Sequence, residues 1–320
     1  FGRFESKMLE YDIKSVSIDR PVFITGFPRS GSTLLAEILS FCQEFTSFQY
    51  RDYPFVHVPY FWNLIRRGVP VSSKRVERSH KDRLQINLKS PEALEEILWM
   101  SFIDRLHDPS VSNLLEDDDS YPEFEEFYTA TIKKLLFLRK GSRYFAKNNA
   151  NTGRISYINS IWPDAFFVLP YRDPVTQVSS CLKQNRLFSA VQNKDPGALR
   201  YMRRQGHFEF GLDFRPQNYG DDAKTGIILD HWASGNYALA YAHLWNNCYG
   251  YICKILKENP DIRARSLVLS YESLCNMTDR RLRDFIRFCN VPDKDEPRIL
   301  KEWEDKISLP DYYNSDFSQK

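Results

Sequence analysis

The stretch TGFPRSGSTLL, residues 25 to 35, constrains the fold more than any other part of the chain. An apolar run at 22–25 leads into it, and the following LLAEILSF has helical composition. Gly26 and Gly31 have the G-x-x-x-x-G spacing of a phosphate-binding loop between a strand and a helix. At the next position, where a Walker A motif has lysine, the chain has Ser32. The stretch therefore predicts an anion-binding loop of an α/β protein that is not a standard kinase.

This loop offers several hydrogen-bond donors to an anion. Arg29 supplies a fixed positive charge, and the serine and threonine hydroxyls add side-chain donors. Backbone N–H groups should converge on the anion at the helix N-terminus; they belong to Ser30, Gly31, Ser32 and Thr33. The alternative is a strand-to-helix turn in which a serine merely caps the helix.

The rest of the chain repeats the strand-then-helix pattern. Apolar runs at 22–25, 165–171 and 266–271 are each followed by turn residues and a helical pattern. Longer helical patterns cover 120–140 and 231–258. We therefore expect a three-layer, P-loop-like α/β fold with a central parallel sheet flanked by helices. No linker divides the sequence, so we expect one domain over residues 1–320.

The segment 189–226 interrupts this pattern. It is rich in glycine, proline, arginine and aromatic residues and has no sustained period. Long irregular insertions in compact domains are often functional lids, and we expect a lid or a substrate-binding insertion here. A solvated variable loop is the alternative.

A second anion site is predicted after the strand at 165–171. Arg172 follows that strand, Asp173 is placed to cap the next helix, and Pro174 suits its first turn. An arginine at the carboxyl end of a strand can bind phosphate but cannot ligate a metal. Ser180 lies about two helical turns later, so its hydroxyl can reach the same side.

Composition limits the partners. The formal net charge is only +2, so we do not expect nucleic acid as a partner. No apolar run is long enough for a membrane span, no leader opens the chain, and the six cysteines have no metal or disulfide spacing. We therefore expect a soluble cytoplasmic protein with reduced thiols and no metal, and the first residue, Phe1, is compatible with removal of an upstream segment.

The two anion sites resemble the signatures of the PAPS-dependent sulfotransferases. In that family the first loop holds the 5′-phosphosulfate, and an Arg-x7-Ser pair, here Arg172 and Ser180, holds the 3′-phosphate. A third stretch, VLSYESLCNMTDRRLRDFIRFCNV at 268–291, looks like the late strand and helix of the same family. The three matches occur in family order. The chain resembles the bacterial or protein-tyrosine branch rather than the cytosolic, histidine-type branch.

The resemblance implies transfer of a sulfuryl group from PAPS to a hydroxyl, or less readily an amine, without a metal. The family has a lysine that contacts the leaving oxygen, and Lys147 stands at the similar place, so we assign this role to Lys147 with Arg29. Cytosolic members have a histidine two residues after that lysine, whereas this chain has Asn149, which cannot take a proton.

The base is then sought among acidic residues, because the similar bacterial and protein-tyrosine members have one shortly after the first helix. Asp52 is the carboxylate nearest that place, and aromatic neighbours could raise its pKa. The reserves are His57, His231 and Glu92.

Further donor contacts are expected after the insertion, at Trp232 and Ser234. The family's Arg-Lys-Gly run is absent, and arginines of the insertion could substitute for it: Arg200, Arg203 or Arg204. The acceptor could be a small molecule, a carbohydrate or a carrier-bound hydroxyl. The rival functions are a non-catalytic nucleotide-binding module on the same fold and an ATP-dependent phosphotransferase.

Overall fold

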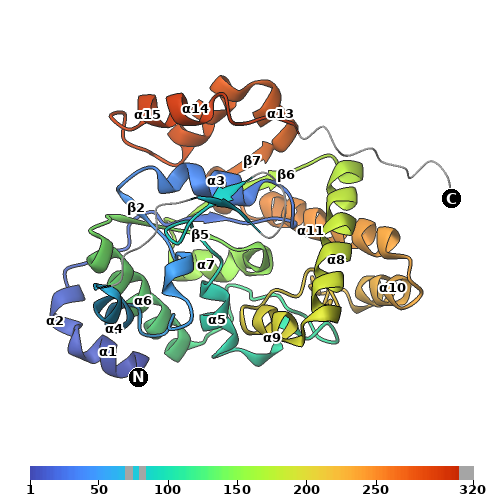
Figure 1. Cartoon of the computed structure of the whole chain (residues 1–320), viewed down its shortest axis with the longest axis horizontal. Coiled ribbons are helices and arrows are strands. Elements are labelled where there is room, and N and C mark those ends of the chain that lie inside the picture. Colours follow the sequence, from blue (N-terminus) through green and yellow to red (C-terminus); the bar gives the residue numbers. More distant parts are fainter. Residues whose placement is uncertain (69–74, 79–83, 310–320) are drawn as a thin grey trace.

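A five-stranded parallel sheet forms the centre of the computed structural model, which describes residues 1–68, 75–78 and 84–309. The strand order is β2-β5-β1-β6-β7, and every neighbouring pair is parallel (Figure 1). The strands are β1 (Val22–Ile24), β2 (Phe45–Thr46), β5 (Arg143–Lys147), β6 (Phe166–Tyr171) and β7 (Ser266–Ser270). The parallel sheet expected from the sequence is therefore confirmed.

Alternate residues of the strands face two separate hydrophobic cores. In β1, Val22 and Ile24 belong to one core, and Phe23 belongs to the other. The first core is shared with α3 (Ser32–Ser40), α13 (Tyr271–Asn276), α14 (Thr278–Phe288) and α15 (Glu296–Trp303). The second is shared with α5 (Glu95–Met100), α6 (Pro122–Arg139), α7 (Ile155–Ile161), α8 (Pro174–Lys194) and α11 (Tyr237–Glu258). Helices thus cover both faces of the sheet, and the expected three-layer fold is confirmed (Figure 1).

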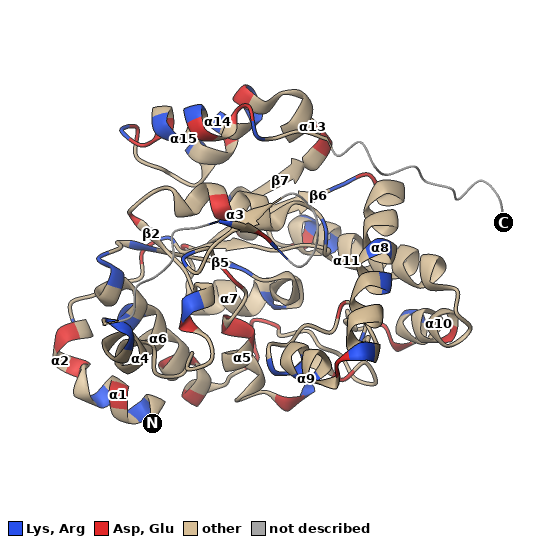
Figure 2. Cartoon of the chain, in the orientation of Figure 1, with Lys and Arg blue, Asp and Glu red and all other residues tan. Residues whose placement is uncertain are grey.

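Smaller elements surround these layers. The remaining helices are α1 (Gly2–Met8), α2 (Glu10–Ile13), α4 (Pro59–Arg66), α9 (Pro196–Arg204), α10 (Asp222–Ala233) and α12 (Pro260–Ala264), with single 3₁₀ turns at Tyr50–Asp52, Asp104–His107 and Asn149–Arg154. A short antiparallel hairpin pairs β3 (Val76–Glu77) with β4 (Gln85–Ile86). Positive and negative side chains are mixed along outer helices such as α1 and α14 (Figure 2). Among the described residues, we find no helix with the length and apolar character needed to cross a bilayer.

Two sequence expectations change in detail. The helix expected over 231–258 is interrupted, because α10 ends at Ala233, Gly235 has a positive φ of 75°, and α11 begins at Tyr237. The segment 189–226 is mostly helical rather than irregular: it contains the end of α8, all of α9 and the start of α10. Its irregular part is confined to residues 205–221.

The parallel strands bring four chain segments to one edge of the sheet. The phosphate-binding loop follows β1, Lys147 ends β5, Arg172 follows β6, and Tyr271 follows β7. Because β5, β1, β6 and β7 are neighbours in the sheet, these segments lie side by side. Ligands of open α/β sheets bind at this carboxyl edge.

Candidate active site

The loop between β1 and α3 has the backbone of an anion-binding turn. Arg29 and Gly31 both have left-handed backbone angles, with φ of 70° and 94°. Gly31 is the N-cap of α3, and a Cβ atom there would lie 2.6 Å from Cδ2 of Tyr271. Glycine is thus required at position 31 both by its φ and by the tyrosine ring against it.

Helix α8 supports this loop from behind. The side-chain amide of Gln177 donates hydrogen bonds to the backbone oxygens of Phe27 (3.2 Å) and Pro28 (2.9 Å). The side chain of Gln177 is itself oriented by the indole N–H of Trp245, which donates to its oxygen at 2.9 Å. Gln177 is fully buried, so these loop carbonyls are satisfied inside the protein.

A cavity of about 660 Å³ opens beside the loop. It is large enough for a nucleotide together with part of a second ligand. Its polar lining includes Arg29, Ser32, Thr33, Arg78, Glu92, Lys147, Asn149, Arg172, His207 and Glu209. Its aromatic and apolar lining includes Phe41, Tyr50, Phe188, Tyr201, Met202, Phe210 and Tyr271.

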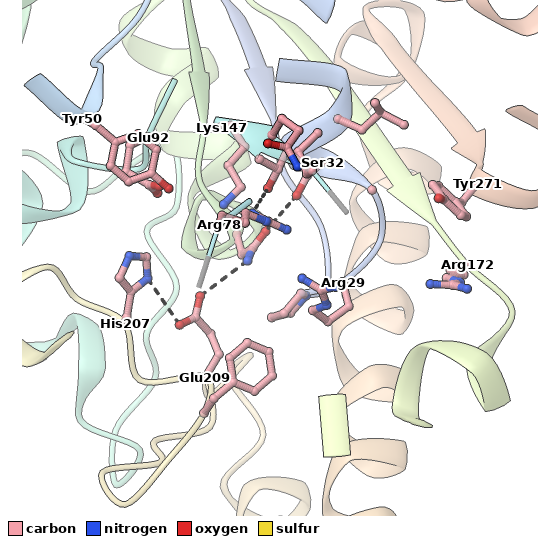
Figure 3. A pocket seen from close by; sticks show the side chains of 18 of the residues that line it. Arg29, Ser32, Tyr50, Arg78, Glu92, Lys147, Arg172, His207, Glu209 and Tyr271 are labelled. Atoms are coloured by element: carbon pink, nitrogen blue, oxygen red, sulfur yellow. Dashed lines mark hydrogen bonds and ion pairs between the residues drawn. The ribbon is translucent and has the colours of Figure 1, made fainter. Parts of the chain in front are cut away.

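Both predicted anion sites reach the cavity, the first through Arg29 and the second through Arg172, whereas Ser180 is fully buried and does not line it. Arg29 donates from Nε to the Ser180 hydroxyl at 3.0 Å, which links the loop to α8. Arg172 lies over the ring of Tyr271, with 4.9 Å from its guanidinium carbon to the ring centroid, and its Nε is 3.7 Å from Oε1 of Glu272. Arg29 and Arg172 both line the cavity from different strand ends (Figure 3). Asp173 caps α8 as expected, accepting from the Thr176 N–H at 2.9 Å.

Ionisable groups gather near Lys147. Burial lowers the pKa of Lys147, although the negative charge of Glu92 opposes this effect. Burial by itself would raise the pKa of Glu92, but Lys147, His207 and a hydrogen bond from Tyr50 lower it overall. Burial likewise would lower the pKa of His207, whereas its hydrogen bond and ion pair with Glu209 raise it. The charged form of Glu92 is therefore favoured by Lys147, His207 and Tyr50 despite its burial.

A hydrogen-bond chain connects the loop to this cluster. The Ser32 hydroxyl donates to the Asn149 side-chain oxygen at 3.5 Å, and the Asn149 amide donates to Glu209 at 3.4 Å. Glu209 in turn lies 3.6 Å from Nδ1 of His207 (Figure 3). Burial would raise the pKa of Glu209, but His207 lowers it to about 2. Asn149 thus links the loop to the His207–Glu209 pair.

Asp52 lies outside the lining of this cavity. It is fully buried, and both of its carboxylate oxygens accept from Nη2 of Arg139, at 2.7 Å and 2.5 Å. It also accepts from the Gln49 N–H at 2.8 Å. Glu92, a reserve in the sequence analysis, lines the cavity, and its charge acts on Lys147 more strongly than that of Glu209 does.

Other expected residues also lie away from the cavity lining. Trp232 packs on Phe214 at 3.6 Å between ring centroids, and Ser234 bonds back to the Asp230 carbonyl at the end of α10. His57 contacts Ser101, and His231 stacks on His243. The insertion contributes other side chains than the expected arginines Arg200, Arg203 and Arg204: it lines the cavity with Tyr201, Met202, Gln205, His207, Glu209 and Phe210. Ser30 is fully buried and does not line the cavity, so we expect only its N–H to serve an anion.

Sequence reasoning missed four residues of this site: Arg78, His207, Glu209 and Tyr271. His207 and Glu209 belong to the insertion that was singled out, and their alternate spacing in HFEF gave a weak signal. Tyr271 lies within the third matching stretch. Arg78 gave no signal, because the strands of its hairpin have only two residues each.

The fold and site together define a class: an α/β protein with a P-loop-like turn and a crevice whose cations suit a ligand with two anionic ends. Residues 21–208 match the model of the Sulfotransferase family, so the chain belongs to that family. No curated protein matches it in sequence.

Two solved structures are similar in fold. Sulfotransferase STF9 from Mycobacterium avium has 13% identity and a TM-score of 0.54, with 95% of this chain and 73% of that chain covered. Sulfotransferase STF1 from Mycobacterium tuberculosis has 15% identity and a TM-score of 0.50, with 95% and 77% covered. At these identities the likeness concerns the fold.

Proposed function

We propose that this family member transfers the sulfuryl group of PAPS to a hydroxyl acceptor and releases adenosine 3′,5′-bisphosphate (PAP). One observation carries the proposal: Arg29, Lys147 and Arg172 come from three different strand ends and line a single cavity. Two separated cationic ends suit a nucleotide with phosphates on both its 5′ and 3′ sides. In this assignment the fixed cations are arginine and lysine side chains, and no metal is required.

The residues present fit such a donor. The N–H groups of the loop, the hydroxyls of Ser32 and Thr33, and Arg29 would hold the 5′-phosphosulfate. Arg172 and Ser180 would hold the 3′-phosphate. When bound, the donor supplies an activated sulfuryl group, so the protein has to position it and stabilise the departing phosphate.

The side chains divide the reaction between them. Glu92 takes the proton of the acceptor hydroxyl, whose oxygen then forms a bond to sulfur. The bond between sulfur and the bridging oxygen of the 5′-phosphate breaks, and its electron pair stays on that oxygen. Lys147 and Arg29 stabilise the developing charge there by hydrogen bonds. The lowered pKa of Glu92 keeps this base ionised at neutral pH.

The lining of the cavity is partly aromatic. Tyr50, Phe188, Tyr201 and Phe210 line it together with Met202. Such a wall suits an acceptor with an apolar part, whether it is a small molecule, a carbohydrate or a carrier-bound hydroxyl.

Replacement of Glu92 by Gln tests the proposal. Gln keeps the shape but cannot accept the proton, so we expect kcat for transfer from PAPS to fall by about 100-fold or more. The Kd for PAP, measured by calorimetry, should change little. An E92Q enzyme with the wild-type rate would contradict this role for Glu92.

Asp52→Asn is the matched comparison. Loss of its charge leaves Arg139 buried without its partner, so we expect a loss of about 3–5 kcal/mol in unfolding free energy. The protein that remains folded should keep its kcat.

If wild-type protein binds PAP tightly but sulfates no acceptor in a broad panel, the chain is a non-catalytic nucleotide-binding module.

A further inference from the structure

We propose that Arg78 is a third cation at the transferring sulfuryl group, beside Arg29 and Lys147. This assignment rests on the proposed function and extends it to a residue outside the signatures that resemble the family. Arg78 is a residue of the β3–β4 hairpin region rather than of the central sheet.

The backbone of Arg78 is fixed where the hairpin closes. Its N–H donates to the carbonyl of Leu84 at 3.2 Å, directly after the paired residues Glu77 and Gln85. Both Arg78 and Leu84 line the cavity. The hairpin therefore brings Arg78 into the cavity lining from outside the central sheet.

The guanidinium of Arg78 reaches the phosphate-binding loop. Its Nη1 donates to the Thr33 hydroxyl at 3.1 Å. Its charge also acts on Lys147, whose pKa is lowered first by burial and further by Arg78 and Arg29. Arg78, Arg29 and Lys147 thus line the same cavity as the loop residues Ser32 and Thr33. Like charges gathered in one partly buried place favour an anion between them.

The chemistry of transfer gives Arg78 a role there. As the bond from sulfur to the 5′-phosphate oxygen breaks, negative charge grows on that oxygen. The sulfuryl group, with its own oxygens, meanwhile moves from the phosphate oxygen to the acceptor oxygen. A planar guanidinium offers several N–H donors and can contact Thr33 and an oxyanion together. Arg78 would thus hold the sulfuryl oxygens, while Lys147 and Arg29 hold the departing oxygen.

A purely structural role is the competing explanation, because Arg78 also joins the hairpin to the loop. The same hairpin has a second arginine that separates the two roles. Arg75 donates from Nη2 to Glu37 of α3 at 3.4 Å, donates to the Gln85 carbonyl at 3.3 Å, and lies over the ring of Phe41. Arg75 also lines the cavity, but its hydrogen bonds hold the hairpin to α3 rather than to the loop. Arg75→Gln therefore removes one hairpin contact and leaves the contacts of Arg78 with Leu84 and Thr33 in place.

The experiment measures kcat with PAPS, and the Kd for PAP, in wild type, Arg78→Gln, Arg78→Lys and Arg75→Gln. PAP has no sulfuryl group, so a residue that contacts this group should affect transfer far more than PAP binding. For R78Q we expect kcat to fall about 100-fold and the Kd for PAP to change by less than about threefold. R78K should be intermediate, because lysine keeps the charge without the planar fork. R75Q should stay within about threefold of wild type in both quantities.

Rescue gives a second readout. Added guanidinium ion at low millimolar concentration should restore part of the kcat of Arg78→Ala and have no such effect on Arg75→Ala. Equal losses of kcat in R78Q and R75Q, or a loss of PAP affinity as large as the loss of rate, would overturn the assignment. Wild-type protein without transfer activity would instead remove the proposed function itself.

Discussion

His207 and Glu209 form an ion pair in the cavity wall, with 3.6 Å between Nδ1 and Oε2. The pKa of His207 is raised above its ordinary 6.5, so its stabilising effect is complete below that pH and is lost as pH rises through the folded pKa. The pKa of Glu209 is lowered from 4.5 to about 2, so its effect is present above 4.5 and is lost as pH falls toward 2. Lys147 and Glu92 act on the same pair.

A stability profile tests this pair. The difference in unfolding free energy between wild type and Glu209→Gln should be largest between the two ordinary pKa values, 4.5 and 6.5. It should shrink on both sides of that window. Chemical denaturation at a series of pH values measures it, and a difference that stays constant from pH 3 to pH 9 would show that the pair does not titrate as described.

Asp52 and Glu92 show that residue type alone does not determine the role of a carboxylate. Both are carboxylates, and Asp52 stands nearer the expected place and between two tyrosines in the sequence. The partner of Asp52 is Arg139, at the far end of α6, which no local pattern connects to it. Glu92 gains its neighbours Tyr50 and Lys147 from two other chain segments. A carboxylate's role therefore depended on long-range contacts.

At the scale of elements, helix α8 serves two functions. Its N-terminus, capped by Asp173, follows Arg172, and its buried face carries Gln177 and Ser180 toward the loop. The cap and the first turn were predictable, because Asp-Pro at a helix start is a local signal. The contact of Gln177 with the loop carbonyls was not.

Replacement of Gln177 by Leu tests the support of the loop. It removes the amide donor to the Phe27 and Pro28 carbonyls and the acceptor of the Trp245 indole N–H, so we expect a loss of about 2 kcal/mol or more in unfolding free energy. The displaced loop should also raise the Kd for PAP. Gln192→Leu is the control on the same helix: Gln192 is also buried and accepts from the Leu212 N–H at 2.7 Å. It should lower stability without changing PAP affinity, and equal PAP binding in both variants would contradict this role of Gln177.

Element lengths explain other differences between expectation and structure. β2 has only two residues, and the apolar run of β5 is short because the strand begins with Arg143 and ends with Lys147. Neither strand therefore gave a clear pattern in the sequence. The helical pattern over 231–258 continued through Gly235, because apolar residues on both sides keep a similar spacing. A positive φ at one glycine was enough to divide it.

At the scale of the whole molecule, the proposed nucleotide site spans two strand ends, the loop after β1 and Arg172 after β6. If Arg172 and Ser180 hold the 3′-phosphate, PAP should bind more tightly than AMP, which lacks that phosphate. Arg172→Ala should weaken PAP binding by about 10-fold or more and leave AMP binding nearly unchanged, since a charged hydrogen bond contributes about 1.5–3 kcal/mol. Titration calorimetry of both nucleotides against both proteins measures the coupling. A variant that loses the same affinity for PAP and AMP would place Arg172 elsewhere in the nucleotide site.

The sequence by itself determined the α/β class, the anion-binding loop, the arginine after β6 and the resemblance that the family match supports, because each depends on residues close together in the chain. Turns, helix caps and the phosphate-binding loop are formed by residues that are close in the chain, so their residue types predict them directly. Only the tertiary structure decided which carboxylate lies beside Lys147 and that Arg78 reaches Thr33 from a separate hairpin. Such contacts join segments tens of residues apart, and burial and charge at the site depend on that packing rather than on local pattern.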